Sequence, residues 1–396
     1  MSHKLPNGWT SKSLGEIFEF KNGFNADKTM YGKGKKFINV MEVIKNHYLH
    51  EKDIPGQVDI PDDAFCLYSV VKGDVLFNRT SETPEEIGLT AVYLDEEPVT
   101  FGGFVIRARP TGKILDQEFC KYCFLSSRVR KEIIKRGQGV IRANIGQGDL
   151  SDVLLQIPSQ KEQEKIAKIL STWDKAIKNI ESLIANKVIV KAHFLNIIFK
   201  GNLCLNGKTR ECYTLDSLFT QRSDRGGEGD LLSVTRDRGI IPQNESDKKD
   251  TSNSDKSKYL RIYPNDIVYN TMRMWQGVSA VSRLQGLVSP AYTVCYLKNK
   301  EFNVDYFGYF FKNKKMVHEF HRRSQGLVDD TLNLKYENFR KIKIYIHPPE
   351  QQTAIARFFS TLDMEISMLQ KQLIYLKTQK QGLLQQLLNG NKIVKV

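Results

Sequence analysis

An internal repeat constrains this chain more than any other feature, because a sequence segment near its middle recurs in related form 189 residues later. The first copy begins with the sequence IPSQKEQEKIA, and the second begins with IHPPEQQTAIA. A repeat of this length, with a globular stretch before each copy, predicts two similar modules that are each followed by a long helix. The matched segments are residues 157–167 and 346–356, 171–174 and 360–363, and 201–202 and 390–391.

Both copies carry apolar residues at alternating steps of four and three, the spacing that keeps one stripe of a helix against a partner helix in a coiled coil. In the first copy these residues are Ile166, Leu170, Trp173, Ile177, Ile180, Ile184, Phe194 and Ile198. In the second they are Ile355, Phe359, Leu362, Ile366, Leu369, Leu373, Leu376, Leu383 and Leu387. Lysines also occupy seam positions (Lys187, Lys191 and Lys380), and the pattern leaves open whether they mark register, a partner contact or fraying.

The globular stretches predict an α+β fold, because short segments rich in β-branched and aromatic residues precede a helical segment in each. The expected strands are residues 36–40, 74–78, 89–93 and 103–107 in the first module, and 231–235, 266–270, 278–281 and 291–295 in the second. The expected helices are near residues 116–135 and 303–323. We therefore divide the chain into a first module (1–157), a first helix (158–203), a second module (204–346) and a second helix (347–396).

The charge of the chain points to a polyanionic partner. It has 59 Lys and Arg residues and a formal net charge of +14, spread along its length, which favours nucleic acid over a merely soluble basic protein. No apolar run approaches the ~20 residues needed to cross a membrane. The first nine residues lack the apolar region of an export signal, so we expect a cytoplasmic protein with reduced cysteines.

No pattern in the sequence predicts an active site or a bound metal. Cys120 and Cys123 have C-x-x-C spacing without a second ligand pair nearby, and phenylalanines stand at the matching places of the second module, so we expect a helix core. His318 and His321 are one residue too close for the H-E-x-x-H zinc arrangement. The Asn-Pro-Pro-aromatic motif of amino-methyltransferases is absent as well.

Polar and basic corners after strands recur in both modules. Arg, Asn and Gln can make bidentate contacts to guanine and adenine in the major groove, and Arg beside Ser or Thr suits phosphates. The candidate DNA-binding residues are Asn78, Arg79, Thr80, Arg107, Arg136, Gln138, Arg142, Asn144, Arg236, Arg238, Asn270, Arg273, Gln276, Arg322, Arg323 and Gln325. Arg273 lies in the corner most like a base reader.

The chain resembles the DNA-specificity subunits of type I restriction–modification systems over essentially its whole length. The specific marks are the two module-to-helix junctions, the run Leu231–Thr235, and Tyr269-Asn270-Thr271-Met272-Arg273-Met274-Trp275-Gln276-Gly277 followed by Val288-Ser289-Pro290-Ala291-Tyr292. The first module departs from that run, with Phe77-Asn78-Arg79-Thr80 in its place. The resemblance implies two α/β target-recognition domains, separated by two antiparallel coiled-coil helices in a pseudo-two-fold repeat.

The resemblance also implies a mechanism without catalysis by this chain. Each domain would read one half of a bipartite DNA sequence, and helices of ~60 Å would set the unread spacer. Methyltransferase subunits, probably two, would dock on the helices and bind S-adenosylmethionine, and restriction subunits would use ATP and Mg²⁺. No cofactor is expected in this chain. The alternatives from the residues are a stand-alone coiled-coil DNA-binding regulator, a self-sufficient modification enzyme and a protein-binding scaffold.

Overall fold

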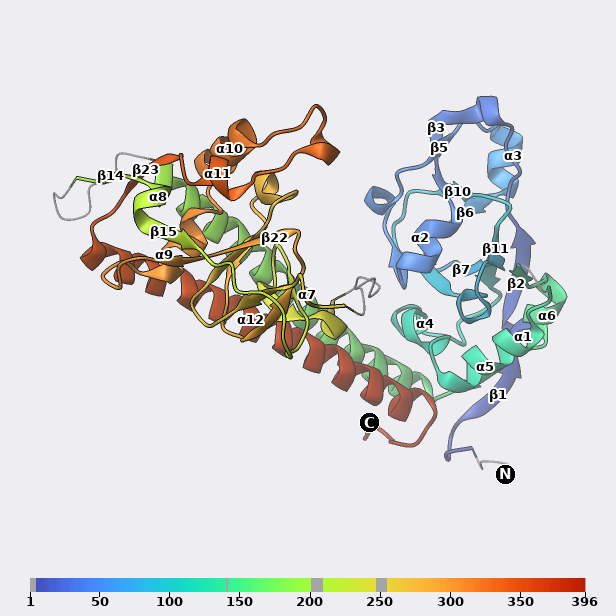
Figure 1. Ribbon diagram of the computed structural model, residues 1–396. Helices are drawn as coiled ribbons and strands as arrows, with labels where there is room; N and C mark the ends of the chain where they lie inside the picture. The colour runs from blue at the N-terminus through green and yellow to red at the C-terminus, as the bar shows by residue number, and fades with distance from the viewer. Residues whose placement is uncertain (1–4, 140–141, 201–208, 247–254, 396) are drawn as a thin grey trace. The chain divides into compact units, whose positions relative to one another are not determined.

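The computed structural model describes residues 5–139, 142–200, 209–246 and 255–395. The chain divides into two compact units, the first made of residues 1–180 and 372–396 and the second of residues 181–371. Each unit contains one globular module and parts of two long helices, α7 (Gln160–Lys200) and α12 (Pro349–Leu388) (Figure 1). The α+β class predicted from the sequence is confirmed. The predicted match of residues 201–202 to 390–391 involves residues 201–202, which lie outside the described residues.

The first unit is built around a five-stranded sheet of order β2-β11-β7-β9-β4, with a four-stranded sheet of order β5-β3-β10-β6 and the pairs β1-β13 and β12-β8. Its strands are β1 (Thr10–Ser13), β2 (Phe18–Asn22), β3 (Tyr31–Ile38), β4 (Tyr48–Leu49), β5 (Gln57–Val58), β6 (Ser69–Val70), β7 (Val75–Asn78), β8 (Thr80–Ser81), β9 (Thr90–Tyr93), β10 (Val99–Phe101), β11 (Val105–Pro110), β12 (Ala143–Asn144) and β13 (Leu154–Ile157). Its α-helices, besides the long ones, are α1 (Leu14–Ile17), α2 (Val40–Lys45), α3 (Asp62–Leu67), α4 (Gln117–Cys123), α5 (Ser127–Arg136) and α6 (Gln147–Ser151).

The second unit repeats the central part of this plan. Its four-stranded sheet, of order β15-β22-β19-β20, corresponds to β2-β11-β7-β9, and the pair β14-β23 corresponds to β1-β13. Two further pairs, β16-β17 and β18-β21, complete its strands. The strands are β14 (Glu211–Thr214), β15 (Phe219–Gln221), β16 (Leu232–Val234), β17 (Ile240–Pro242), β18 (Leu260–Ile262), β19 (Ile267–Asn270), β20 (Ser279–Val281), β21 (Gly286–Val288), β22 (Tyr292–Leu297) and β23 (Lys343–Ile346). The helices are α8 (Leu215–Leu218), α9 (Val304–Phe310), α10 (Lys314–Arg323) and α11 (Tyr336–Phe339).

Each central sheet is covered on both faces, which explains why its strands are almost continuously apolar. In β7, Val75 and Phe77 join the core that also contains α4 and α5, whereas Leu76 joins a separate core on the opposite face. In β19, Tyr269 and Val268 divide between two cores in the same way. Successive side chains of a strand point to opposite faces, so both faces of these strands are apolar only where both are buried.

The helices predicted at 116–135 and 303–323 are each two helices with a break, which corrects the sequence prediction. Ser126 stands at the first break, and its hydroxyl accepts a hydrogen bond from the backbone N–H of Val129. Asn313 stands at the second break and accepts in the same way from Met316. A side chain that satisfies the free N–H groups of a helix start stabilises a new helix at that point. Apolar residues continue at helical spacing on both sides of each break, so the sequence pattern conceals the breaks.

A buried glutamine joins each module to the long helix that follows it. Gln163 accepts a hydrogen bond from the Asp116 backbone N–H at 2.8 Å and donates to the carbonyls of Ile114 and Pro158, each at 3.0 Å. Gln352 accepts from Asn303 at 3.0 Å and donates to the His347 carbonyl at 2.8 Å. These two glutamines occupy matching places in the repeat. The most similar segment of the two copies is therefore also the segment that holds each module to its long helix.

The long helices lie side by side within each unit. In the second unit Lys187 pairs with Glu365 at 2.6 Å and Lys191 pairs with Asp363, so positions rise on α7 as they fall on α12 and the helices are antiparallel. α12 ends at Leu388, inside the segment assigned to the second helix, because Gly390 takes a left-handed φ of 70°. Of the predicted seam residues, Ile166, Leu170, Ile355, Phe359 and Ile366 are buried, and Trp173, Ile177, Ile184, Leu362 and Leu373 are half-buried.

The helix α7 is long and apolar enough, judged by length and composition alone, to cross a membrane. The expectation that no segment reaches this length is therefore wrong by that criterion. Lys187 and Lys191 lie in the apolar half of α7, and both are paired with acids of α12. Lysines paired with acids of a neighbouring helix fit a helix that packs against another helix, because charged side chains that face lipid are costly.

Candidate nucleic-acid interface

The corner that follows β7 is organised by Asn78. Its side chain is buried, donates to the Glu86 carbonyl at 3.0 Å, and accepts from the Thr80 backbone N–H at 3.1 Å. Both functions of the amide are used inside the protein. Asn78 therefore shapes the turn and does not reach DNA from this position, which corrects its assignment as a DNA-binding residue.

The loop from Gln138 to Asn144 is held against this corner. The backbone groups of Gln138 and Asn144 exchange two hydrogen bonds, at 2.8 and 2.7 Å, and the Thr80 hydroxyl donates to the Asn144 side-chain oxygen at 2.7 Å. Arg79 is half-buried and donates to the Gly103 carbonyl at 3.3 Å. Residues 140–141, at the middle of the loop, lie outside the described residues. The structure thus brings together Arg79, Thr80, Gln138, Arg142 and Asn144, of which the last three are exposed.

The corner that follows β19 has the same hydrogen-bonding plan. Asn270 accepts from the Met272 backbone N–H at 3.0 Å, as Asn78 does from Thr80. Gln325 and Asn333 exchange two backbone hydrogen bonds, at 2.9 and 2.8 Å, as Gln138 and Asn144 do. The Leu334 N–H donates to the Thr271 carbonyl at 2.8 Å, and the matching bond in the first unit joins Ile145 to Arg79 at 3.0 Å. The two modules therefore build one corner twice.

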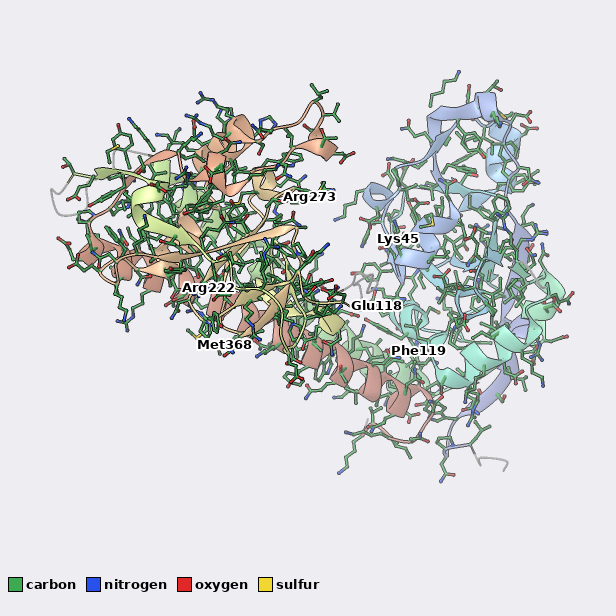
Figure 2. All side chains as sticks on the ribbon, in the orientation of Figure 1. Lys45, Glu118, Phe119, Arg222, Arg273 and Met368 are labelled. Carbon is green, nitrogen blue, oxygen red and sulfur yellow. The ribbon has the colours of Figure 1, made fainter. Side chains whose placement is uncertain are left out.

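The surface of the second corner is exposed. Arg273 is exposed in the turn after β19 (Figure 2), and Trp275 supports this turn by donating to the Met272 carbonyl at 3.0 Å. The Trp275 ring lies 5.8 Å from that of His321 on α10, which ties the turn to the basic end of that helix. Arg322 and Arg323 at this end are exposed, and Gln276 is half-buried. Arg322 also pairs with Glu319 at 2.7 Å.

A fully exposed leucine lies on the second loop, which the sequence reasoning missed. Leu327 is 101% exposed and Val328 is 61% exposed. The Thr331 hydroxyl oxygen accepts from both of their backbone N–H groups at 3.2 Å and donates to the Val328 carbonyl at 2.9 Å. An apolar side chain held in water by a structured turn is available for contact with a partner. The available signal was the match of Gln325-Gly326-Leu327-Val328 to Gln138-Gly139-Val140-Ile141.

Two further arginines lie in a separate hairpin of the second unit. Arg236 and Arg238 are exposed in the turn between β16 and β17. Arg238 donates to the Glu245 carbonyl at 3.1 Å, and Lys312 donates to the Arg236 carbonyl at 3.2 Å. The pairings that join Asn270, Gln325 and Asn333 do not include this hairpin.

Two candidates of the first unit serve its own packing. Arg107 is only 4% exposed and donates to the Ser69 carbonyl at 2.5 Å, and burial lowers the pKa of its guanidinium. Its assignment to DNA therefore does not fit this structure: both faces of the sheet are covered, and Arg107 lies on the same covered face as Val105, two residues earlier in β11. Arg136 is half-buried, pairs with Glu132 and donates to the Asp152 carbonyl at 3.3 Å, so most of its donors face its own domain.

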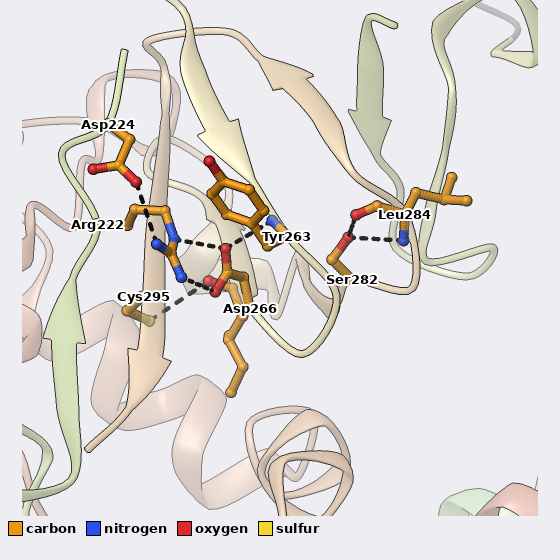
Figure 3. A network of polar contacts seen from close by, with 8 residues as sticks. Arg222, Asp224, Tyr263, Asp266, Ser282, Leu284 and Cys295 are labelled. Carbon is orange, nitrogen blue, oxygen red and sulfur yellow. Dashed lines mark hydrogen bonds and ion pairs between the residues drawn. The ribbon is translucent and has the colours of Figure 1, made fainter. Parts of the chain in front are cut away.

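A buried Arg–Asp pair supports the strand that leads to each corner. Asp74 precedes β7, and Arg109 donates to both its oxygens at 2.9 and 2.7 Å. Asp266 precedes β19, and Arg222 donates to both its oxygens at 2.8 and 2.9 Å (Figure 3). Figure 3 also shows Tyr263, whose ring centroid lies 4.7 Å from the Arg222 guanidinium. The sequence shows the repeated aspartate, but its arginine comes from different places in the two units: Arg109 lies in β11, and Arg222 directly follows β15.

The cysteine pair is part of a helix core, as predicted. Cys120 and Cys123 are each 2% exposed in the core of the first unit. Burial raises the pKa of the Cys123 thiol well above its ordinary value, so the reactive or metal-binding thiolate is disfavoured. Among the described residues, no group of three or more His, Cys, Asp or Glu side chains is arranged to hold a metal ion.

Two α+β modules with a shared corner, each followed by a long helix, define a duplicated recognition protein. The chain matches the family described as "Type I restriction modification DNA specificity domain" over residues 6–188 and 238–378. It therefore belongs to this family, whose members are non-catalytic specificity subunits.

Individual relatives agree over the full length. The chain is 24% identical over 421 residues to the putative type I restriction enzyme MjaX specificity subunit of Methanocaldococcus jannaschii, covering 99% of this chain and 95% of that protein. The crystal structure of the type I restriction–modification S subunit from M. genitalium has a TM-score of 0.55 at 18% identity, covering 100% of this chain and 99% of that one. A chain from a structural study of type I R-M complex assembly and conformational transition has a TM-score of 0.61 at 13% identity, covering 98% and 100%. These structural similarities establish the shared fold.

Proposed function

We propose that this specificity subunit directs a type I restriction–modification complex to a bipartite DNA sequence in the cytoplasm, with each module reading one half-site. The observation that carries the proposal is the duplicated corner. Its backbone is held by the same hydrogen bonds in both units, while its exposed side chains differ. A shared scaffold with different readers suits two different half-sites.

The helices set the spacer in this proposal, and they provide the docking surface for two methyltransferase subunits. Those partners would bind S-adenosylmethionine, and restriction subunits would bring ATP and Mg²⁺. Exposed apolar residues on the helices support a docking role. They include Met364, which is 61% exposed, and Met368, which is 67% exposed and is labelled in Figure 2. The net charge of +14 supports DNA as the other partner.

Methylome sequencing tests the proposal directly. Adenine methylation would be mapped in the host genome with and without this gene. Loss of one split motif with a constant gap is expected, and that motif also identifies the target. An unchanged methylome, in a host where the partner genes are expressed, would overturn the proposal.

A change of helix length tests the spacer. Four residues inserted into each long helix, between Asp174 and Lys187 of α7 and between Glu365 and Lys380 of α12, add ~6 Å, which is near two base pairs. We expect methylation to move to sites with a longer spacer. Methylation of sites with the original spacer at the original rate would show that the helices do not measure it.

A further inference from the structure

The same three-residue cluster occurs where each module meets the long helices. In the first unit, the Tyr122 hydroxyl donates to one oxygen of Asp174 at 2.7 Å, and Lys380 donates to the other at 2.5 Å. The Lys380 ammonium also lies 5.6 Å from the centroid of the Tyr122 ring. One carboxylate thus receives a donor from a module helix and a donor from the second long helix.

The second unit repeats the cluster with the roles of the long helices exchanged. The Tyr309 hydroxyl donates to one oxygen of Asp363 at 2.8 Å, and Lys191 pairs with the other oxygen. The Lys191 ammonium lies 5.5 Å from the centroid of the Tyr309 ring. Asp174 and Asp363 are separated by the repeat distance of 189 residues, and so are Lys191 and Lys380. The lysines whose role the heptad pattern left open are therefore members of these clusters.

The charges and the burial of these side chains make each cluster a strong contact between a module and the long helices. The side chains of Lys380 and Lys191 are only 13% and 22% exposed, so each ammonium has lost most of its water and depends on its aspartate. Burial, with the nearby aspartate, raises the pKa of both tyrosines, which keeps their hydroxyls protonated as donors. Hydrogen bonds to a charged acceptor are among the stronger ones in proteins.

We propose that Tyr122–Asp174–Lys380 and Tyr309–Asp363–Lys191 are positioning clusters that fix the number of base pairs between the two half-sites. This rests on the proposed function, in which the two modules read separate half-sites. Each cluster fixes the module against a long helix and also fixes the register of one long helix on the other. The position of each reader along the helix pair then follows from a single carboxylate.

The apolar seam alone does not supply this precision. Apolar heptad contacts are similar after a shift of one heptad, whereas a polar residue at a seam position specifies register. The pair Lys187–Glu365 adds a contact in the second unit only, since Leu376 and Ala176 stand at the matching places of the first. The two tyrosine clusters are therefore the register device that both units share.

The test compares spacer profiles of the assembled methyltransferase complex. Complexes with wild-type chain or the double variant Tyr122→Phe/Tyr309→Phe would be given duplexes with constant half-sites and spacers from about four base pairs shorter to four longer, a range that includes the ~10 Å of a one-heptad shift. The wild type should prefer one spacer. The variant should lose about tenfold of that preference against spacers one base pair away, while its rate on the preferred spacer stays within about threefold.

Matched variants separate positioning from general damage. Tyr336→Phe removes a half-buried hydroxyl that donates to the Phe219 carbonyl at 2.9 Å inside the second module, and it should leave the profile unchanged. Lys191→Met should broaden the profile, and Lys191→Arg, which keeps the charge, should restore it. If the tyrosine variant does not fold, judged by its thermal melt, the lysine variants provide the measurement.

The outcomes distinguish this proposal from the proposed function. Folded variants that methylate with the wild-type spacer profile would overturn the positioning role alone. A wild-type complex that methylates but shows no spacer preference would overturn the bipartite reading, and the positioning role with it.

Discussion

The corner after β7, with the loop held against it, exposes Gln138, Arg142 and Asn144, whereas the corner after β19 and its loop expose Met272, Arg273 and Leu327. The two corners nevertheless share their main hydrogen bonds: the backbone pairing of each loop, and the bond that the side chain of the asparagine ending each strand accepts from the backbone two residues later. The backbone scaffold and the exposed side chains are therefore separate parts of each module. Surface side chains can change without loss of the fold because the hydrogen bonds that hold the corner lie mainly in the backbone.

The buried aspartates below the two corners show the same scaffold with unequal support. The partner of Asp74, Arg109, has a side chain that is 33% exposed, whereas the partner of Asp266, Arg222, is 21% exposed. Arg222 also lies 4.7 Å from the ring centroids of Tyr263 and Tyr296. The second pair is therefore more enclosed.

Loss of one charge from the enclosed pair should have the largest effect. We expect Asp266→Asn to lower the free energy of unfolding by about 3 kcal/mol, because the Arg222 guanidinium loses its buried counter-charge and keeps only the more exposed carboxylate of Asp224, 3.3 Å away. Asp74→Asn should cost less, since water reaches Arg109 more easily. Calorimetry of the full chain measures both variants. Asp224→Asn, at the exposed second partner of Arg222, is the control, and equal losses at positions 74 and 266 would contradict the comparison.

Acid should destabilise the second unit through His347, which has Pro158 as its counterpart in the first unit. Burial lowers the pKa of His347 from 6.5 to about 4. Its lowered folded pKa means that the unfolded chain binds the proton more tightly, so this stability is present above pH 6.5 and is lost as the pH falls towards 4. We expect a loss of about 2 kcal/mol between pH 7 and 4.5, measured by denaturant unfolding. The loss should be smaller in His347→Gln, and an unchanged pH dependence there would exclude His347 as its source.

Arg273→Ala should separate the two readers. We expect about a tenfold to hundredfold loss of methylation at sites that carry the correct second half-site, with first half-site discrimination unchanged, because a bidentate base contact discriminates by about 1–3 kcal/mol. Arg142→Ala is the reciprocal variant and should affect only the first half-site. Competition between duplexes mutated in one half-site measures both. Equal weakening on all sequences would identify Arg273 as a phosphate contact.

Leu327→Ala should have the smallest effect and should sharpen the contrast between the loops. Its removal from a fully exposed position should change the unfolding free energy by less than about 0.5 kcal/mol. We expect a severalfold loss of discrimination at thymines of the second half-site, since an apolar side chain can contact the thymine methyl group. Methylation rates on duplexes with uracil in place of thymine provide the measurement. A uniform response to every substitution would contradict this role.

The duplication, the two long helices and the positions of most central strands could be predicted from the amino-acid sequence, because repeats and periodicity are local patterns. The sequence also singled out Asn270, Arg273 and Gln325 as candidates in two separate segments, which the structure brings together. Periodicity did not reveal the helix breaks at Ser126 and Asn313, where a single capping hydrogen bond decides the structure. Nor did it separate Asn78 and Arg107, which are buried, from Arg142 and Arg273, which are exposed.

The partners of the charged residues could not be predicted in this way, because they depend on the fold. Lys380 meets Asp174 across more than two hundred residues of chain, and Arg222 meets Asp266 from the segment after β15, whereas the matching aspartate of the first module is met by Arg109 of β11. The sequence does not show where a charged side chain points. Whether such a side chain faces DNA or a buried carboxylate depends on which elements the fold places beside it. The energy of such a charge is set by that environment, through loss of water and the distance to its partner.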